Sequence, residues 1–131
     1  MSSRIKKGLF YTGNHEWVSI EGDTVTVGIT DYAQDSLGEI VYVELPETDE
    51  QFSADDEAAS IESVKTAAPV YTPFSGTITE VNEDLEDSPE LINSDPYDTF
   101  IYVMHVDGEI ETDDLMDPEA YKEFLAAQED D

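Results

Sequence analysis

The sequence predicts a mainly β domain, either a small antiparallel sandwich or a partly closed barrel, with two or three short peripheral helices. Apolar residues recur at every second position in several short stretches, of which residues 24–29 are the clearest. Glycine, proline and acidic residues separate these stretches, which is typical of antiparallel strands joined by turns. A chain of 131 residues fits one domain of this kind.

The first half of the chain predicts three strands and one helix. Thr30 is a typical N-cap residue, and Gly38 follows the helical pattern as a typical C-terminal stop. Pro46 ends the stretch after the helix, because proline cannot donate a ladder hydrogen bond. The predicted elements are strands over residues 10–20 (opening after a turn at Gly13 and Asn14), 24–29 and 39–45, and a helix over residues 31–37.

The second half predicts a hairpin, a buried strand and a terminal helix. Pro73 and Gly76 interrupt the return strand of the hairpin. The terminal helix begins at Asp117 and Pro118, and its side chains at 121, 124 and 125 have the spacing that docks a helix on a sheet. The predicted elements are a loop over residues 47–56, strands over 58–64, 70–81 and 100–106, an acidic turn over 82–87 and a helical turn over 88–93.

We expect a single domain over residues 10–128, a flexible basic arm over residues 1–9 and a frayed tail over residues 129–131. The chain has no cysteine, which excludes disulfides and thiolate chemistry and is compatible with the cytosol. No apolar run approaches the length of a membrane span, and no apolar signal segment follows the basic start. These features predict a cytoplasmic protein, which we expect to be a monomer.

The formal net charge is −28, from 33 acidic and five basic residues. Leu, Ile, Val and Phe still provide 31 of the 131 residues, above the roughly 20% below which such a charged chain stays unfolded. The charge disfavours DNA, RNA and anionic membranes as partners. Because the acids are spread along the whole chain, we favour adaptation to a salt-rich cytoplasm and a halophilic source. Docking on basic partners is compatible with that interpretation.

The sequence contains no self-sufficient active site or metal site. His15 and His105 are far apart and lack a third ligand, and His105 is expected to be a core or edge histidine of its strand. Residues 82–87 lack the central glycine of a calcium-binding loop. No phosphate-binding glycine loop and no nucleophile-elbow serine is present. We therefore expect a protein that is not itself an enzyme.

Lys65 is the side chain that the charge pattern isolates. It is the only cationic residue between Gly8 and Tyr121. It lies between two predicted strands, so we expect it on the tip of a hairpin, held out into solvent. From position alone, a turn lysine that aids solubility is an equally good interpretation.

Six blocks of the sequence closely resemble the H proteins of the glycine cleavage system. The blocks occur in the order and spacing of that family and extend from about Tyr11 to Phe124, nearly the whole chain. They read HEWV at 15–18, GITDYAQ at 28–34, LGEIV at 37–41, VELP at 43–46, ESVK at 62–65 and EDSPELINSDPY at 86–97. The resemblance implies a lipoyl-domain-like hybrid of barrel and sandwich, with short peripheral helices and a C-terminal helix.

The same resemblance implies that Lys65 carries lipoic acid in amide linkage. The chain would then carry the aminomethyl group of glycine as a non-catalytic component of a multienzyme system. Its implied partners are the pyridoxal-phosphate-dependent glycine decarboxylase (P protein), the tetrahydrofolate-dependent aminomethyltransferase (T protein), dihydrolipoamide dehydrogenase (L protein) and a lipoylating enzyme. A group carrier of this kind needs one nucleophilic amine on a rigid tip, while the cofactor supplies the reactivity.

Further site residues follow from the resemblance. Glu62, Ser63 and Val64 are candidates for recognition at the tip, and Glu62 is equally well interpreted as a solvated turn acid. Glu16 and Ser36 are candidates for the cleft that receives the loaded arm in this family. Ser36 and Pro69 stand where the family often has more polar or charged groups. How tightly the cleft of this chain holds the loaded arm therefore does not follow from the resemblance.

Two other function classes are open. An H-like lipoyl carrier can serve to pass lipoate to other enzymes, and it would then fail to couple with the decarboxylase. The third class is a biotinyl carrier or a purely structural β module. Biotinyl carriers usually have Met-Lys-Met at the tip, whereas this chain has Val64-Lys65-Thr66.

Overall fold

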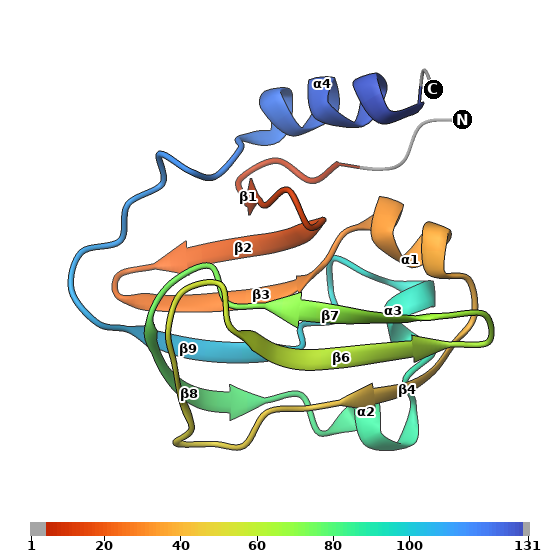
Figure 1. Cartoon of the computed structure of the whole chain (residues 1–131), viewed down its shortest axis with the longest axis horizontal. Coiled ribbons are helices and arrows are strands. Elements are labelled where there is room, and N and C mark those ends of the chain that lie inside the picture. Colours follow the sequence, from red (N-terminus) through yellow and green to blue (C-terminus); the bar gives the residue numbers. More distant parts are fainter. Residues whose placement is uncertain (1–4, 130–131) are drawn as a thin grey trace.

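The computed structural model describes the backbone of residues 5–129 and the side chains of residues 5–127. Within this range the strands form two open antiparallel sheets and no closed barrel (Figure 1). The strands are β1 (Phe10–Tyr11), β2 (Glu16–Glu21), β3 (Thr24–Ile29), β4 (Ile40–Glu44), β5 (Gln51–Phe52), β6 (Glu57–Ser63), β7 (Ala67–Tyr71), β8 (Gly76–Val81) and β9 (Tyr102–Val106). The prediction of a mainly β sandwich-like fold with peripheral helices is confirmed.

The main core lies between the two sheets. The larger sheet has the strand order β1-β2-β3-β9-β8-β5, and the smaller sheet has the order β4-β6-β7. Figure 1 shows β6 and β7 crossing in front of β3 and β9. Period-two alternation puts one face of each strand toward the other sheet, where the side chains are removed from water. Fully buried members of this core include Val18, Val25, Val27, Ile61, Ile78 and Met104.

Helix α1 (Asp31–Leu37) has the bounds that its capping residues predicted. Thr30 Oγ1 accepts a hydrogen bond from the N–H of Ala33 at 3.2 Å. Gly38 follows with φ of 79°, and its N–H donates to the carbonyl of Gln34. The positive φ is the conformation that a C-terminal glycine provides at low cost. The predicted acidic turn over residues 82–87 contains a short helix, α2 (Asp84–Asp87). The predicted helical turn is present as α3 (Leu91–Ser94), shifted toward the C-terminus.

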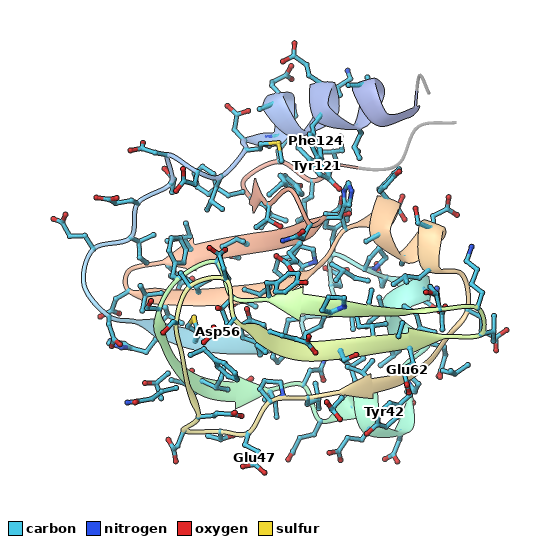
Figure 2. The ribbon with its side chains drawn as sticks, in the orientation of Figure 1. Tyr42, Glu47, Asp56, Glu62, Tyr121 and Phe124 are labelled. Carbon is cyan, nitrogen blue, oxygen red and sulfur yellow. The ribbon has the colours of Figure 1, made fainter. Side chains whose placement is uncertain are left out.

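Helix α4 (Pro118–Glu129) packs on β1 through a second, aromatic cluster. Figure 2 shows Tyr121 and Phe124 on the side of α4 that faces β1. The ring of Tyr121 stacks on Tyr11 with a centroid distance of 4.4 Å. Tyr121 and Leu125 are buried, as the helical spacing predicted. No helix in the described range is long and apolar enough to cross a membrane.

The described part of the predicted N-terminal arm joins this second cluster. Leu9 is buried there, and Ile5 packs against it. Residues 1–4 of the arm and residues 130–131 of the predicted tail lie outside the described range, and Glu129 is the last residue of α4. The domain limits of residues 10–128 stay a prediction.

Four sequence-based expectations differ from the structure. The predicted strand over residues 10–20 is divided into β1 and β2, which pair with each other. The predicted return strand over residues 70–81 is two strands, because the chain leaves the smaller sheet after Tyr71 and enters the larger sheet at Gly76. The predicted loop over residues 47–56 contains β5, which pairs with β8. His105 is neither in the core nor on an edge strand: β9 lies between β3 and β8, and the His105 side chain faces solvent, 3.0 Å from Asp23.

Candidate functional site

Lys65 lies in the tip of the β6–β7 hairpin, and its side chain is exposed. The tip is closed by Ser63, whose N–H donates to the carbonyl of Thr66 at 2.7 Å. The Ser63 hydroxyl oxygen accepts from the N–H groups of Lys65 and Thr66 at 3.3 and 3.1 Å. Side-chain hydrogen bonds of serine to nearby backbone groups stabilise such turns. The lysine backbone is therefore held in place while its amine is free to extend outward.

The tip is also attached to the rest of the molecule. The N–H of Val64 donates to the carbonyl of Glu39 at 3.0 Å, just before β4. The lysine stem lies beside the end of α1, since a Cβ placed on Gly38 would be 3.7 Å from Lys65 Cε. Asn93 on α3 fixes this region further, because it accepts from the N–H of Ile40 and donates to the carbonyl of Gly38. These hydrogen bonds fix the hairpin tip to the start of β4 and the end of α1.

A cleft of about 180 Å³ lies between α1 and β7, the strand that begins two residues after Lys65. One wall contains Tyr32, Ala33, Ser36 and Leu37 of α1. The remaining lining residues are Asn14, His15, Ile29, Ile61, Ala68, Pro69 and Val70. Most of these side chains are apolar, so the cleft can accept an aliphatic group and exclude water from it.

His15 contributes to the cleft wall with a backbone conformation that is uncommon for a residue other than glycine. Its φ is 66°. Its ring Nδ1 lies 2.9 Å from the hydroxyl of Tyr121, which is also 2.7 Å from the hydroxyl of Thr30. The His15 ring contacts Tyr32 at a centroid distance of 4.6 Å. Helix α4 and the start of α1 therefore hold His15 in this position.

Glu16 is buried behind the cleft, with 2% of its surface exposed. Its carboxylate accepts hydrogen bonds from the N–H of Tyr71 at 2.6 Å and from the hydroxyl of Thr12 at 2.9 Å. Burial raises the pKa of Glu16 from 4.5 to about 7, and the two hydrogen bonds only partly oppose this effect. Glu16 is not among the described residues that line the cleft.

The structure brings together the predicted tip residues and one of the two predicted cleft residues. Glu62, Val64 and Lys65 are exposed at or next to the tip, and Ser63 is half-buried because it closes the turn. Ser36 lines the cleft. Sequence reasoning did not single out His15 or Tyr32 as cleft residues. Their signal was their position in two of the family blocks: His15 comes directly before Glu16 in HEWV, and Tyr32 of GITDYAQ lies on the helix that carries Ser36.

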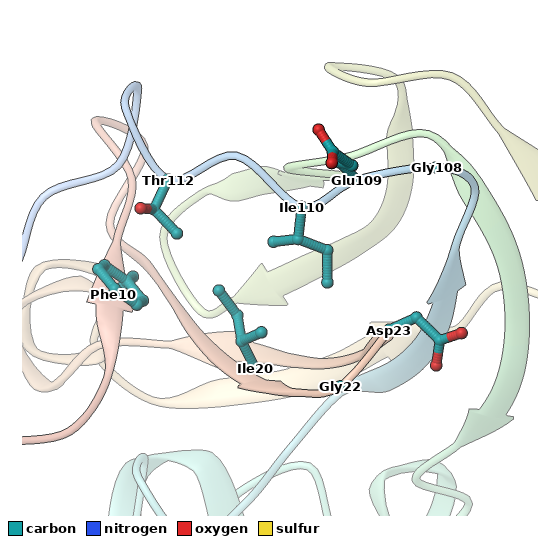
Figure 3. Close-up of a pocket in the computed structure, with 8 residues that line it drawn as sticks. All are labelled: Phe10, Ile20, Gly22, Asp23, Gly108, Glu109, Ile110 and Thr112. Carbon is teal, nitrogen blue, oxygen red and sulfur yellow. The ribbon is translucent and has the colours of Figure 1, made fainter.

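A larger, open hollow of about 720 Å³ lies by the turn between β2 and β3 (Figure 3). This turn is at the end of the sheets opposite the β6–β7 hairpin tip (Figure 1). Figure 3 shows its apolar side chains, Phe10, Ile20 and Ile110, with Asp23 and Glu109 nearby. It contains none of the predicted site residues. In the described range, no group of three or more His, Cys, Asp or Glu side chains is arranged to hold a metal ion.

Comparisons with known proteins agree with this arrangement. The family model described as "Glycine cleavage H-protein" matches residues 9–128. The glycine cleavage system H protein of Staphylococcus carnosus is 47% identical over 122 residues, covering 92% of this chain and 97% of the relative. That of Thermotoga maritima is 52% identical over 119 residues, covering 90% and 96%.

A solved structure gives the same result at the level of the fold. The crystal structure of a glycine cleavage system H protein from Mycobacterium marinum superposes with a TM-score of 0.84 at 36% sequence identity. The match covers 93% of this chain and 99% of the solved chain. With sequence and structure matched over almost their full length, the chain belongs to the glycine cleavage H-protein family.

Proposed function

We propose that this chain is the lipoyl carrier of a glycine cleavage system and that Lys65 is the attachment site. The observation that carries the proposal is the place of Lys65 in the ESVK block, inside the part of the chain that the H-protein family model matches. Lys65 is also the only cation between Gly8 and Tyr121, and it is exposed on a hairpin tip that Ser63 closes. A dithiolane bound at this amine supplies the sulfur chemistry that takes up the aminomethyl group of glycine and is later reoxidised.

The residues around Lys65 fit a lipoyl group. The exposed amine is available for acylation, and amide formation removes its charge. The cleft beside the hairpin offers mainly apolar side chains, among them Leu37, Ile61 and Val70, to an aliphatic arm. His15 and Ser36 add polar groups at its wall. In this proposal the lipoyl arm on Lys65 lies in this cleft when it is loaded.

The chain itself provides position and protection. Ser63 and the contact between Val64 and Glu39 fix the direction in which the lysine leaves the body. The cleft walls exclude water from what they cover. Glu16 supports the β7 wall from behind through the N–H of Tyr71. The chain then serves as a non-catalytic component that carries and positions its cofactor.

We further propose the partners of such a carrier. These are the glycine decarboxylase, the tetrahydrofolate-dependent aminomethyltransferase, dihydrolipoamide dehydrogenase and a lipoylating enzyme. We propose a monomer, because a net charge of −28 makes two copies of the chain repel each other. We also propose a cytoplasm rich in salt, because salt screens the repulsion between acidic residues within the fold.

The proposal is tested on protein purified from its own cells. Intact mass distinguishes a lipoyl group, a biotinyl group and a bare lysine in one measurement, and peptide mapping assigns the group to Lys65. The loaded protein is then incubated with glycine and glycine decarboxylase, and we expect an aminomethyl adduct. A free Lys65 that lipoylating enzymes cannot acylate would overturn the proposal. A lipoylated protein that the decarboxylase cannot load would instead favour lipoate relay.

A further inference from the structure

The described residues include four large apolar side chains that are exposed: Val41, Tyr42, Val64 and Leu91, at 48%, 49%, 67% and 36%. Single exposed apolar residues are common and need no explanation. Three of these four, however, lie close to Lys65: Val41 and Tyr42 on β4, and Val64 on the hairpin tip. This concentration in a chain so rich in charge indicates a surface that is kept apolar for contact.

A bulge in β4 creates this exposure. Ile40 is opposite Ser63 and Tyr42 is opposite Glu62, so Val41 is an extra residue in the ladder between them. The side chains of Ile40 and Val43 are buried, whereas both Val41 and Tyr42 between them face solvent. A regular strand would have turned one of the two inward. Bulges of this kind re-aim side chains next to functional sites.

Tyr42 and Glu62 form a cross-strand pair on the outer face of the smaller sheet. Directly opposite residues of an antiparallel pair lie on the same face. Figure 2 shows the two side chains close together by the end of the sheet where the β6–β7 hairpin projects. The hydrogen bond between the N–H of Val64 and the carbonyl of Glu39 joins the tip to the start of the same strand. We call Val41, Tyr42, Glu62 and Val64 the Tyr42 face.

We propose that the Tyr42 face is the docking surface for the enzyme that acylates Lys65, an inference that rests on the proposed function. That enzyme must bring its reaction centre to Nζ of Lys65 itself, so its body has to contact the residues around the tip. Enzymes that use the loaded arm react at its far end, which lies farther from the tip than Nζ does. The Tyr42 face fits an apolar depression with a basic rim, because its own apolar side chains are bordered by Glu39, Glu44 and Glu62.

The step served by this contact is a simple acyl transfer. The lysine nitrogen attacks the carbonyl carbon of an activated lipoyl group, such as a lipoyl adenylate. A C–N bond forms, the bond between the carbonyl carbon and the adenylate oxygen breaks, and AMP leaves with that electron pair. The nitrogen loses one proton to solvent. Docking that fixes the tip lowers the cost of bringing the nitrogen to the carbonyl.

The experiment measures acylation of the unmodified full chain by a purified lipoate–protein ligase with lipoate and ATP. For Tyr42→Ala we expect a loss in kcat/KM of about tenfold or more, mainly through KM, because interface tyrosines are frequent binding hot spots. Tyr42→Phe keeps the ring and should retain most of the rate. Leu91→Ala, which removes the exposed apolar side chain outside the Tyr42 face, is the matched control and should acylate normally.

Charge is tested in the same assay. Glu62→Lys should raise KM more than Glu80→Lys, which reverses an exposed acid on β8 in the other sheet. Each variant is then loaded to completion with excess ligase, confirmed by intact mass, and offered to glycine decarboxylase, where Tyr42→Ala should behave like the original chain.

Three results would overturn the inference. Tyr42→Ala could be acylated at the original rate, or Leu91→Ala could lose as much acylation kcat/KM as Tyr42→Ala does. Loaded Tyr42→Ala could also lose as much activity with the decarboxylase as the unloaded variant loses with the ligase. If the original chain is acylated in these cases, the proposed function stands and only the docking surface is wrong. If the original chain is never acylated, the proposed function itself fails.

Discussion

The carboxylate of Glu16 in β2 accepts a hydrogen bond from the backbone N–H of Tyr71 at the end of β7, at 2.6 Å. This contact joins the two sheets, because β2 belongs to the larger sheet and β7 to the smaller one. It lies directly behind the cleft wall formed by Pro69 and Val70. A buried acid thus holds the strand that follows the lysine hairpin.

Glu16 is expected to make stability depend on pH in an unusual direction for a carboxylate. Burial raises its pKa to about 7 in the folded chain from 4.5. The folded state therefore binds the proton more tightly than the unfolded state does. The resulting stabilisation is complete below about pH 4.5 and is lost as the pH rises through about 7, a change of order 3 kcal/mol.

The measurement is urea unfolding of the original chain and Glu16→Gln from pH 4 to pH 8. The free energy of unfolding of the original chain, relative to that of Glu16→Gln, should be higher at low pH and should fall as the pH rises through about 7. Glu62→Gln, which alters an exposed acid on β6, is the control and should run parallel to the original chain. Parallel curves for Glu16→Gln would contradict the prediction.

Gly28 is expected to tolerate no side chain. A Cβ there would lie 2.5 Å from Cε2 and Cζ2 of Trp17, its cross-strand partner. The Trp17 indole has little freedom to move, since its N–H donates to the carbonyl of Pro96 at 2.9 Å. We expect Gly28→Ala to lower the free energy of unfolding by about 1–3 kcal/mol, the usual effect of overpacking. Gly13→Ala, with no atom within 4 Å of its added Cβ, should be close to neutral in the same denaturation experiment.

Ser63 is expected to order the lysine tip. Ser63→Ala removes the acceptor of the N–H groups of Lys65 and Thr66. Hydrogen exchange at these two amides should become faster, and acylation of Lys65 should slow because the tip samples more conformations. Global stability should fall by only about 0.5–1.5 kcal/mol. Unchanged exchange at both amides would mean that the hydroxyl does not stabilise the turn.

Lys65 itself is expected to matter for the carrier role and not for the fold. Its side chain is exposed, so Lys65→Ala should change the free energy of unfolding by no more than about 0.5 kcal/mol. The same variant should gain no lipoyl mass with ligase and should not support glycine cleavage. Lys122→Ala removes the exposed lysine of α4 and should acylate fully. Acylation of Lys65→Ala would place the attachment site elsewhere.

Salt is expected to stabilise the fold. A net charge of −28 causes self-repulsion, and the Debye length falls from about 10 Å at 0.1 M salt to about 3 Å at 1 M. The melting temperature should therefore rise as KCl is increased over this range. A melting temperature that does not respond to KCl would argue against adaptation to a salt-rich cytoplasm. Replacing KCl with equimolar sucrose separates screening from general solute effects, since sucrose leaves the Debye length unchanged.

The elements that depend on neighbouring residues were predictable from the sequence. Thr30 and Gly38 placed both ends of α1, and strict alternation placed β3 over Thr24–Ile29. The hairpin tip at Lys65 was predictable for the same reason, because strand ends and turns are set by residues a few positions apart. The isolation of Lys65 is a property of the charge pattern alone.

The cleft and its support were decided by the tertiary structure. The cleft joins residues 14–15, 29–37 and 61–70, and no local pattern states that these segments meet. The change of sheet between Tyr71 and Gly76 depends on pairing with β9, which is far along the chain. Whether Glu16 lines the cleft or lies buried behind it depends on where the N–H of Tyr71 arrives. The sequence by itself thus determined which amine is presented, and long-range packing determined what surrounds it, because contacts between distant segments exist only once the whole core has formed.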